Sequence, residues 1–64
     1  MSLVVKYEDK ELELTKSTTV KRMLERMEIP PETVFVVVNG QVVTQDERVG
    51  PGDDAQIIRV ISGG

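Results

Sequence analysis

The stretch "TVFVVVNGQVV", Thr33 to Val43, decides the fold because it predicts a β-hairpin. Its first part, "TVFVVV", is rich in β-branched and aromatic residues, which favour strands. Asn39-Gly40 is the preferred pair for a two-residue type I′ turn, because both positions need a positive φ. "QVV" then returns as a short strand. Since "TVFVVV" is apolar on both faces, we expect it at the centre of a sheet or in a sheet with a second apolar face.

The segment before this hairpin, "KSTTVKRMLERMEIPPE", has the period of a helix. Apolar residues at i, i+3, i+4 and i+7 predict one amphipathic helix of about two and a half turns. Three successive hydroxyl residues offer an N-cap, and two prolines prevent the helix from continuing. A helix this short is not stable alone, so we expect it to pack on a sheet. The apolar stripe consists of Val20, Met23, Leu24 and Met27.

The two ends of the chain supply the remaining strands. "LVVKY" and "ELELT" alternate and predict a hairpin joined by "EDK", with Leu12 and Leu14 beside the inward face of the first strand. "TQDERVGPGDD" is expected to be an irregular surface loop. "AQIIRVI" is apolar on both faces, and we expect it as a fully buried strand in the middle of the sheet. The order of elements predicts a compact α+β fold with the helix across one face of a mixed sheet of four to five strands.

Composition narrows the possible functions. The chain has 64 residues, enough for one domain over 1–64, and it contains no Cys and no His. Disulfides, thiolate nucleophiles and the commonest general base and zinc ligands are therefore excluded. A net charge of −3 and only one Tyr and one Phe disfavour nucleic-acid binding. With no signal peptide or membrane-spanning run recognisable, we expect a cytoplasmic protein with protein partners.

The acidic pairs Asp46-Glu47 and Asp53-Asp54 are expected to be solvated loop residues. Neither loop has the ligand spacing of a calcium site, so we predict no metal site. The "GPG" from Gly50 to Gly52 is interpreted as a turn, because it lacks the lysine and the strand-loop-helix context of a phosphate-binding loop.

The ending "ISGG", Ile61 to Gly64, places two glycines after a strand-forming run. Glycine loses more conformational freedom on ordering than any other residue. We therefore expect 61–64 to be a flexible C-terminal tail, which is either incidental fraying or the functional part. Extended at about 3.3–3.6 Å per residue, the tail would reach roughly 13–14 Å from the domain. Its α-carboxyl group would be ionised at neutral pH.

Several of these features together carry a family resemblance. They are the order of elements, the "NG" hairpin after "PPETV", the approach "GPGDDAQIIRV" to the last strand, and the terminal "GG". The combination covers nearly the whole chain and resembles the β-grasp sulfur carriers of the ThiS/MoaD family, which are relatives of ubiquitin. The ending "VISGG" looks most like TtuB-type carriers and archaeal ubiquitin-like modifiers. The resemblance implies a β-grasp fold.

The resemblance also implies a function as a carrier rather than an enzyme. A ThiF/MoeB-type activating enzyme would use ATP and Mg to adenylate the carboxylate of Gly64, and the carrier itself would bind no cofactor. A cysteine desulfurase or rhodanese-like donor would then convert it to a thiocarboxylate for a biosynthetic acceptor enzyme. The residues Ile61 and Ser62 before Gly63 favour tRNA thiolation and leave thiamin and molybdopterin synthesis open. No direct nucleic-acid or membrane contact is implied.

The β-grasp arrangement further implies which strand residues face a partner. Val36, Val38, Ala55 and Ile57 would face the helix. An apolar patch would lie on the open face and dock the activating enzyme, with a dimer contact or cover by the loop as alternatives. The patch consists of Phe35, Val37, Ile58 and Val60.

A second class of function stays open at this stage. The chain could be a ubiquitin-like protein modifier or an interaction module that forms isopeptide bonds without transferring sulfur. Surface lysines would then be candidate acceptors of conjugation.

Overall fold

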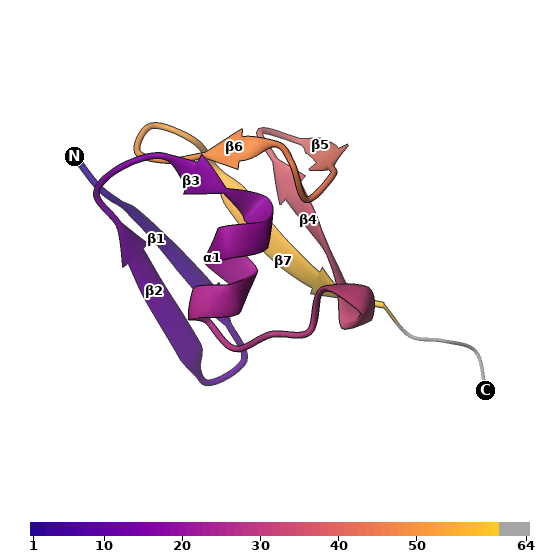
Figure 1. The fold of residues 1–64 in the computed structure, drawn as a ribbon. Helices are drawn as coiled ribbons and strands as arrows, with labels where there is room; N and C mark the ends of the chain where they lie inside the picture. Colours follow the sequence, from indigo (N-terminus) through magenta and orange to yellow (C-terminus); the bar gives the residue numbers. More distant parts are fainter. Residues whose placement is uncertain (61–64) are drawn as a thin grey trace.

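The computed structural model describes residues 1–60, and a single helix lies across one face of the strands (Figure 1). In chain order the elements are β1 (Leu3–Tyr7), β2 (Lys10–Leu14), β3 (Thr18–Thr19), α1 (Val20–Arg26), the 3-10 helix η1 (Pro31–Thr33), β4 (Val34–Val38), β5 (Gln41–Val43), β6 (Arg48–Val49) and β7 (Ala55–Arg59). The predicted tail, 61–64, lies outside the described residues, so its flexibility stays a prediction.

The first hairpin has the predicted register and a tighter turn than expected. Leu14 pairs with Leu3 and Leu12 with Val5, so the leucines of β2 share the inward face of β1. β2 begins at Lys10, which pairs with Tyr7, so the turn is Glu8-Asp9 rather than the whole "EDK". Glu8 adopts a φ of 56°, a left-handed conformation that lets two residues close the hairpin.

The second hairpin confirms the prediction from "NG". Asn39 and Gly40 have φ values of 54° and 83°, as a type I′ turn requires. β4 is central in the order β5-β4-β7, with both neighbours antiparallel to it. β7 also lies beside β1, between the two hairpins (Figure 1). The mixed strand arrangement with one packed helix is the predicted β-grasp fold.

The helix begins as predicted and ends earlier. Thr19 is the N-cap, and its hydroxyl accepts a hydrogen bond from the Arg22 amide at 3.2 Å. Glu28 then takes a φ of 59°, and the Ile29 amide donates to the Leu24 carbonyl at 2.9 Å. This is a Schellman-type C-cap, which closes the helix before the prolines are reached. α1 consequently has seven residues, about two turns.

The segment interpreted as an irregular loop contains a short strand. β6 pairs with β3, with Thr18 opposite Val49 and Thr19 opposite Arg48. Carbonyls of the same segment accept from the first helical amides, Val20 to Glu47 at 2.9 Å and Lys21 to Gln45 at 3.0 Å. The loop thus fixes the start of α1, which local sequence pattern does not reveal.

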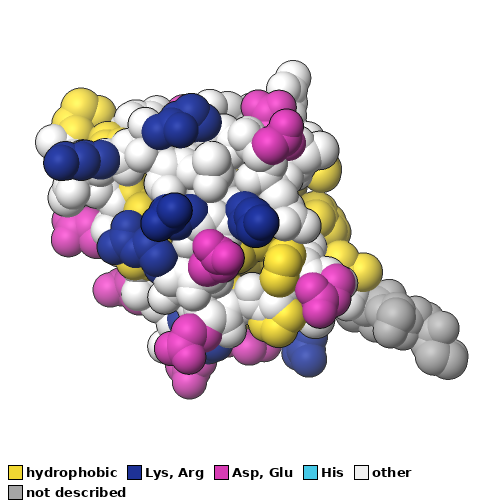
Figure 2. Space-filling model, viewed as in Figure 1, with side chains coloured by type: hydrophobic (Ala, Val, Ile, Leu, Met, Phe, Trp, Pro, Cys, Tyr) yellow, Lys and Arg dark blue, Asp and Glu magenta, His cyan; other side chains and the backbone are white. Residues whose placement is uncertain are grey.

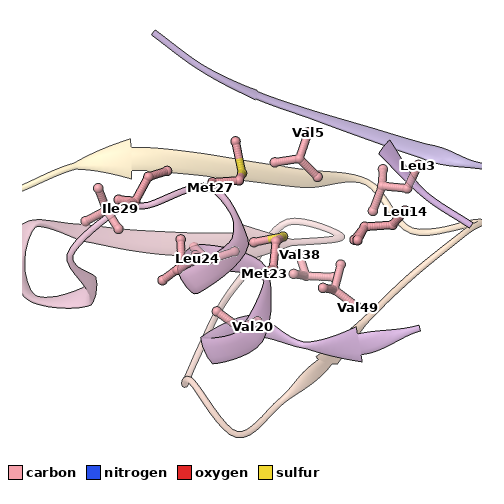
Figure 3. Close-up of a cluster of buried hydrophobic side chains, with 12 residues drawn as sticks. Leu3, Val5, Leu14, Val20, Met23, Leu24, Met27, Ile29, Val38 and Val49 are labelled. Carbon is pink, nitrogen blue, oxygen red and sulfur yellow. The ribbon is translucent and has the colours of Figure 1, made fainter. Parts of the chain in front are cut away.

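The core fills the space between α1 and the sheet (Figure 3). The helical stripe is buried as predicted, together with inward residues of the strands and Val49 of β6. Gly50 is also buried, and a Cβ atom there would lie 2.7 Å from the Cα of Ser17. The buried core residues are Leu3, Val5, Leu14, Val20, Met23, Leu24, Met27, Ile29, Val34, Val36, Val38 and Val49.

Candidate protein-interaction surface

The face of the sheet that α1 leaves uncovered carries the four residues predicted to form a patch. Phe35 and Ile58 are directly opposite each other on β4 and β7, so their side chains lie on one face. They are 37% and 38% exposed, and Val60 is 45% exposed. Val37 is half-buried on the same face of β4. We call Phe35, Val37, Ile58 and Val60 the open-face patch.

The prediction that β7 is fully buried is wrong. Ala55 and Ile57 are half-buried against the core, whereas Ile58 is exposed. The reason is that a strand apolar on both faces needs two covering layers, and the fold supplies α1 on one side only (Figure 1). Central position in the sheet therefore does not bury the second face.

Two further apolar side chains extend this face and were missed by the sequence analysis. Val42 lies opposite Val37 across the hairpin and is 68% exposed. Val4 alternates with the core residues Leu3 and Val5 and is 47% exposed. The two-residue "NG" turn fixes the Val37–Val42 register, and strict alternation places Val4 outward, so both signals were present in the sequence.

The open-face patch continues to the point where the described chain ends. The Val60 amide donates to the Thr33 carbonyl at 2.9 Å, which holds the last described residue against η1. Arg59 forms an exposed ion pair with Glu8 at 3.5 Å. A depression of about 190 Å³ lies beside it, lined in part by Tyr7, Pro30 and Arg59. The predicted functional residues Ile61, Ser62, Gly63 and Gly64 follow directly in sequence and lie outside the described residues.

The acidic loop residues have a structural use that the sequence analysis missed. Asp53 accepts hydrogen bonds from the Gly50 amide at 2.9 Å and the Asn39 side-chain amide at 3.1 Å. Asn39 in turn accepts from the Asp54 amide at 2.9 Å. These bonds tie the loop before β7 to the hairpin turn, so Asp53 is more than a solvated loop residue, whereas the Asp54 side chain is exposed as expected.

The carboxyl group of Asp46 has a pKa that local hydrogen bonds shift. The Thr44 hydroxyl donates to the Asp46 carboxylate and, with the Asp46 backbone amide, lowers the pKa of that carboxyl. Residues 1–60 contain no group of three or more acidic side chains placed to hold a metal ion. In the same residues, no helix is long and apolar enough to cross a membrane. The apolar open face is therefore the most distinctive surface of residues 1–60.

Comparison with known protein families agrees with the fold. The model of the ThiS family matches residues 2–64, which includes every strand, the helix and the ending "ISGG". The match supports a ubiquitin-like carrier that works with an adenylating enzyme and with sulfur-transfer partners. The chain therefore belongs to the ThiS family of small sulfur carrier proteins.

Proposed function

We propose that this protein carries sulfur as a thiocarboxylate on Gly64. The carboxylate would attack the α-phosphate of ATP on a ThiF/MoeB-type enzyme, releasing pyrophosphate and forming an acyl-adenylate. The terminal sulfur of a persulfide on a cysteine desulfurase or rhodanese-like donor would then displace AMP and form an acyl disulfide. A second thiol would attack the donor's cysteine sulfur, which forms a disulfide and releases the thiocarboxylate. The observation that carries this proposal is the family match, which extends through Gly63 and Gly64.

The acceptor that we favour is an enzyme of tRNA thiolation, acting in the cytoplasm. The support is the ending, in which Ile61 and Ser62 precede the glycine pair. Thiamin and molybdopterin synthesis are the competing acceptors.

The open-face patch is proposed as the docking surface for the activating enzyme. Its apolar side chains lie on β4 and β7, and Val60 leads directly into 61–64. Docking through this patch would therefore hold the base of the tail beside the enzyme while the tail enters the active site. Two residues without Cβ atoms fit a narrow channel in any backbone conformation.

Mass spectrometry of the intact protein tests the sulfur chemistry. After incubation with activating enzyme, ATP, Mg and a sulfur donor, we expect a mass increase equal to the difference between sulfur and oxygen. Gly64→Ala should lose this increase without a change in thermal stability, because the residue lies beyond the described core. Isopeptide adducts to lysines without sulfur gain would instead identify a protein modifier.

Substitution on the open face tests the docking surface. Ile58→Asp should abolish adenylation and binding of the activating enzyme while the circular dichroism spectrum stays native. Gln41→Asp is the control, because Gln41 is exposed and lies opposite the core residue Val38, on the other side of the sheet from the patch. Wild-type adenylation by Ile58→Asp would reject the patch as the docking surface, and unfolding would reject our assignment of the faces.

A further inference from the structure

The outer side of α1 carries a concentration of positive charge in a chain that is negative overall. Residues 16–26 hold four of the eight Lys and Arg residues and a single acidic residue, Glu25, although the net charge is −3. Arg48 joins them, because its guanidinium donates to the Ser17 carbonyl at 3.3 Å and hydroxyl at 3.0 Å. Figure 2 shows Lys and Arg side chains gathered over the region of α1 and β3, with acidic side chains among and around them. The basic face consists of Lys16, Lys21, Arg22, Arg26 and Arg48.

The side chains of the basic face form no ion pair within residues 1–60, although Arg48 donates hydrogen bonds to Ser17. All five side chains belong to exposed residues. Ion pairs among residues 1–60 are limited to Lys6 with Glu11 and Arg59 with Glu8, both elsewhere on the surface. Glu25 lies among the basic residues of α1 but forms no ion pair with them there. The charges are therefore available to an external partner.

The positions of these charges also oppose the stability of the helix. The first turn of α1 contains no acidic residue, and Lys21 and Arg22 stand at its positive dipole end. Arg22 occupies the position three residues after the Thr19 N-cap, where a capping box has Glu or Gln. Arg22 and Arg26 are like charges at i and i+4. Arg26 in the last turn suits the helix dipole, but Lys21 and Arg22 in the first turn do not, which indicates a use for them other than folding.

We propose that the basic face is a second interaction surface, which binds an acidic surface of a partner protein. The five exposed cations form no ion pairs among residues 1–60, so they can attract the carboxylates of a partner protein. Three residues of the basic face are exposed residues of α1, which lies across one side of the sheet (Figure 1), whereas the open-face patch lies on the side that α1 leaves uncovered. Both surfaces can therefore be occupied at once. This inference rests on the charge distribution and not on the proposed sulfur chemistry.

An acidic protein fits this face better than RNA does. Both aromatic residues, Tyr7 and Phe35, belong to strands of the sheet, so no aromatic side chain is available here to stack on bases. The first helical amides are already bonded to Glu47, Gln45 and Thr19, so they offer no phosphate site.

Titration of isotope-labelled protein with poly-L-glutamate, followed by NMR of the backbone amides, tests this proposal. At low salt we expect shifts confined to residues 16–26 and 48, and their loss as salt rises through the physiological range. Total tRNA is the comparison probe. Absence of shifts, or shifts spread equally over Lys6 and Arg59, would overturn the proposal. Tighter binding of tRNA at the same amides would also overturn it, because the surface would then recognise nucleic acid.

Arg22→Glu separates a binding role from a structural one. The new glutamate completes a capping box with Thr19. It also stands four residues before Arg26, where the opposite charges attract, so the melting temperature should rise. Binding of poly-L-glutamate should nevertheless weaken by about threefold to tenfold, because an attractive charge becomes repulsive. Lys6→Glu is the control, with the same change of net charge on the open side of β1. Unchanged binding by Arg22→Glu, or equal loss in both variants, would refute the basic face.

Discussion

Two neighbouring cross-strand pairs have opposite environments although they share the same two strands. Val36 pairs with Ile57 on the side covered by α1, and Phe35 pairs with Ile58 one residue away on the open side. Val36 is 2% exposed, whereas Ile58 is 38% exposed. All four side chains are large and apolar, so hydrophobicity alone does not distinguish them. The difference comes from the layer above each face.

The comparison separates two uses of apolar residues. On the covered side, side chains of β4 and β7 pack with α1 and contribute to folding. On the open side, the same residue types leave a contiguous apolar surface, which monomers rarely keep without a partner. Changes on the covered side should therefore reduce stability, and changes on the open side should reduce binding.

The largest expected effect comes from placing a charge on the covered side. Val36→Asp buries a carboxylate with no cationic partner, and a small domain has only about 5–15 kcal/mol of stability to lose. We expect no cooperative unfolding transition at 25 °C by circular dichroism. Phe35→Asp should remain folded, because its side chain reaches solvent. A folded Val36→Asp variant beside an unfolded Phe35→Asp variant would invert the comparison.

Close packing of the strand pair β3–β6 on the covered side also depends on Gly50. In Gly50→Ala, the new Cβ atom would lie 2.7 Å from the Cα of Ser17, so the strand pair β3–β6 must shift. Overpacking of this kind costs about 1–3 kcal/mol, which urea denaturation would measure. Ser17→Gly should restore little stability in the double variant, because the closest atom belongs to the backbone. Full restoration would show that the Ser17 side chain is the obstacle.

Adjacent isoleucines give the most closely matched comparison. Ile57→Ala should cost about 1–2 kcal/mol, below the range for a fully buried residue, because Ile57 is half-buried against the core. Ile58→Ala should cost less than about 1 kcal/mol, since its side chain already contacts solvent. Urea denaturation of both variants measures the difference. Equal losses would show that the open face contributes to folding as much as the covered face.

Much of the fold, including the strands that carry the two faces, could be predicted from the sequence. Periods of two and 3.6 located the main strands and the helix, and Asn39-Gly40 fixed both the turn and the strand register. The helix stripe and the opposed faces of β4 followed from alternation. The two-residue strands β3 and β6 could not be found, because each is shorter than any period and exists only through pairing with a segment far away in the sequence.

Other features depend on tertiary contacts that local pattern does not encode. Asp53 could not be distinguished from a solvated acid, because its partners, Asn39 and Gly50, meet it only after the hairpin and loop have folded together. Gly50 was interpreted as a turn residue, yet its close approach to Ser17 is the stronger constraint. The apolar pattern of β7 alone suggested a fully buried strand, and only the β-grasp resemblance placed Ile58 and Val60 on an open face, because the number of covering layers is a property of the whole fold.

The smallest expected effect concerns a single charge in the loop that borders the covered side. The Thr44 hydroxyl and the Asp46 backbone amide bond the Asp46 carboxylate and lower its pKa below the ordinary value of about 3.9. A group whose pKa is depressed by folding adds stability above its unfolded pKa, and that stability is lost as pH falls through the folded pKa.

Thr44→Val removes the main cause of this depression, so NMR titration should show a higher pKa for Asp46. Wild type should then lose more stability than Thr44→Val as the solution is acidified below the ordinary pKa of an aspartate. The difference should be small, because Asp46 is exposed and water screens its charge. An unchanged Asp46 pKa would show that the backbone amide alone holds the carboxylate. The dependence of stability on pH in this loop would then come from the backbone hydrogen bond, whereas the stability of the covered face comes from side-chain packing.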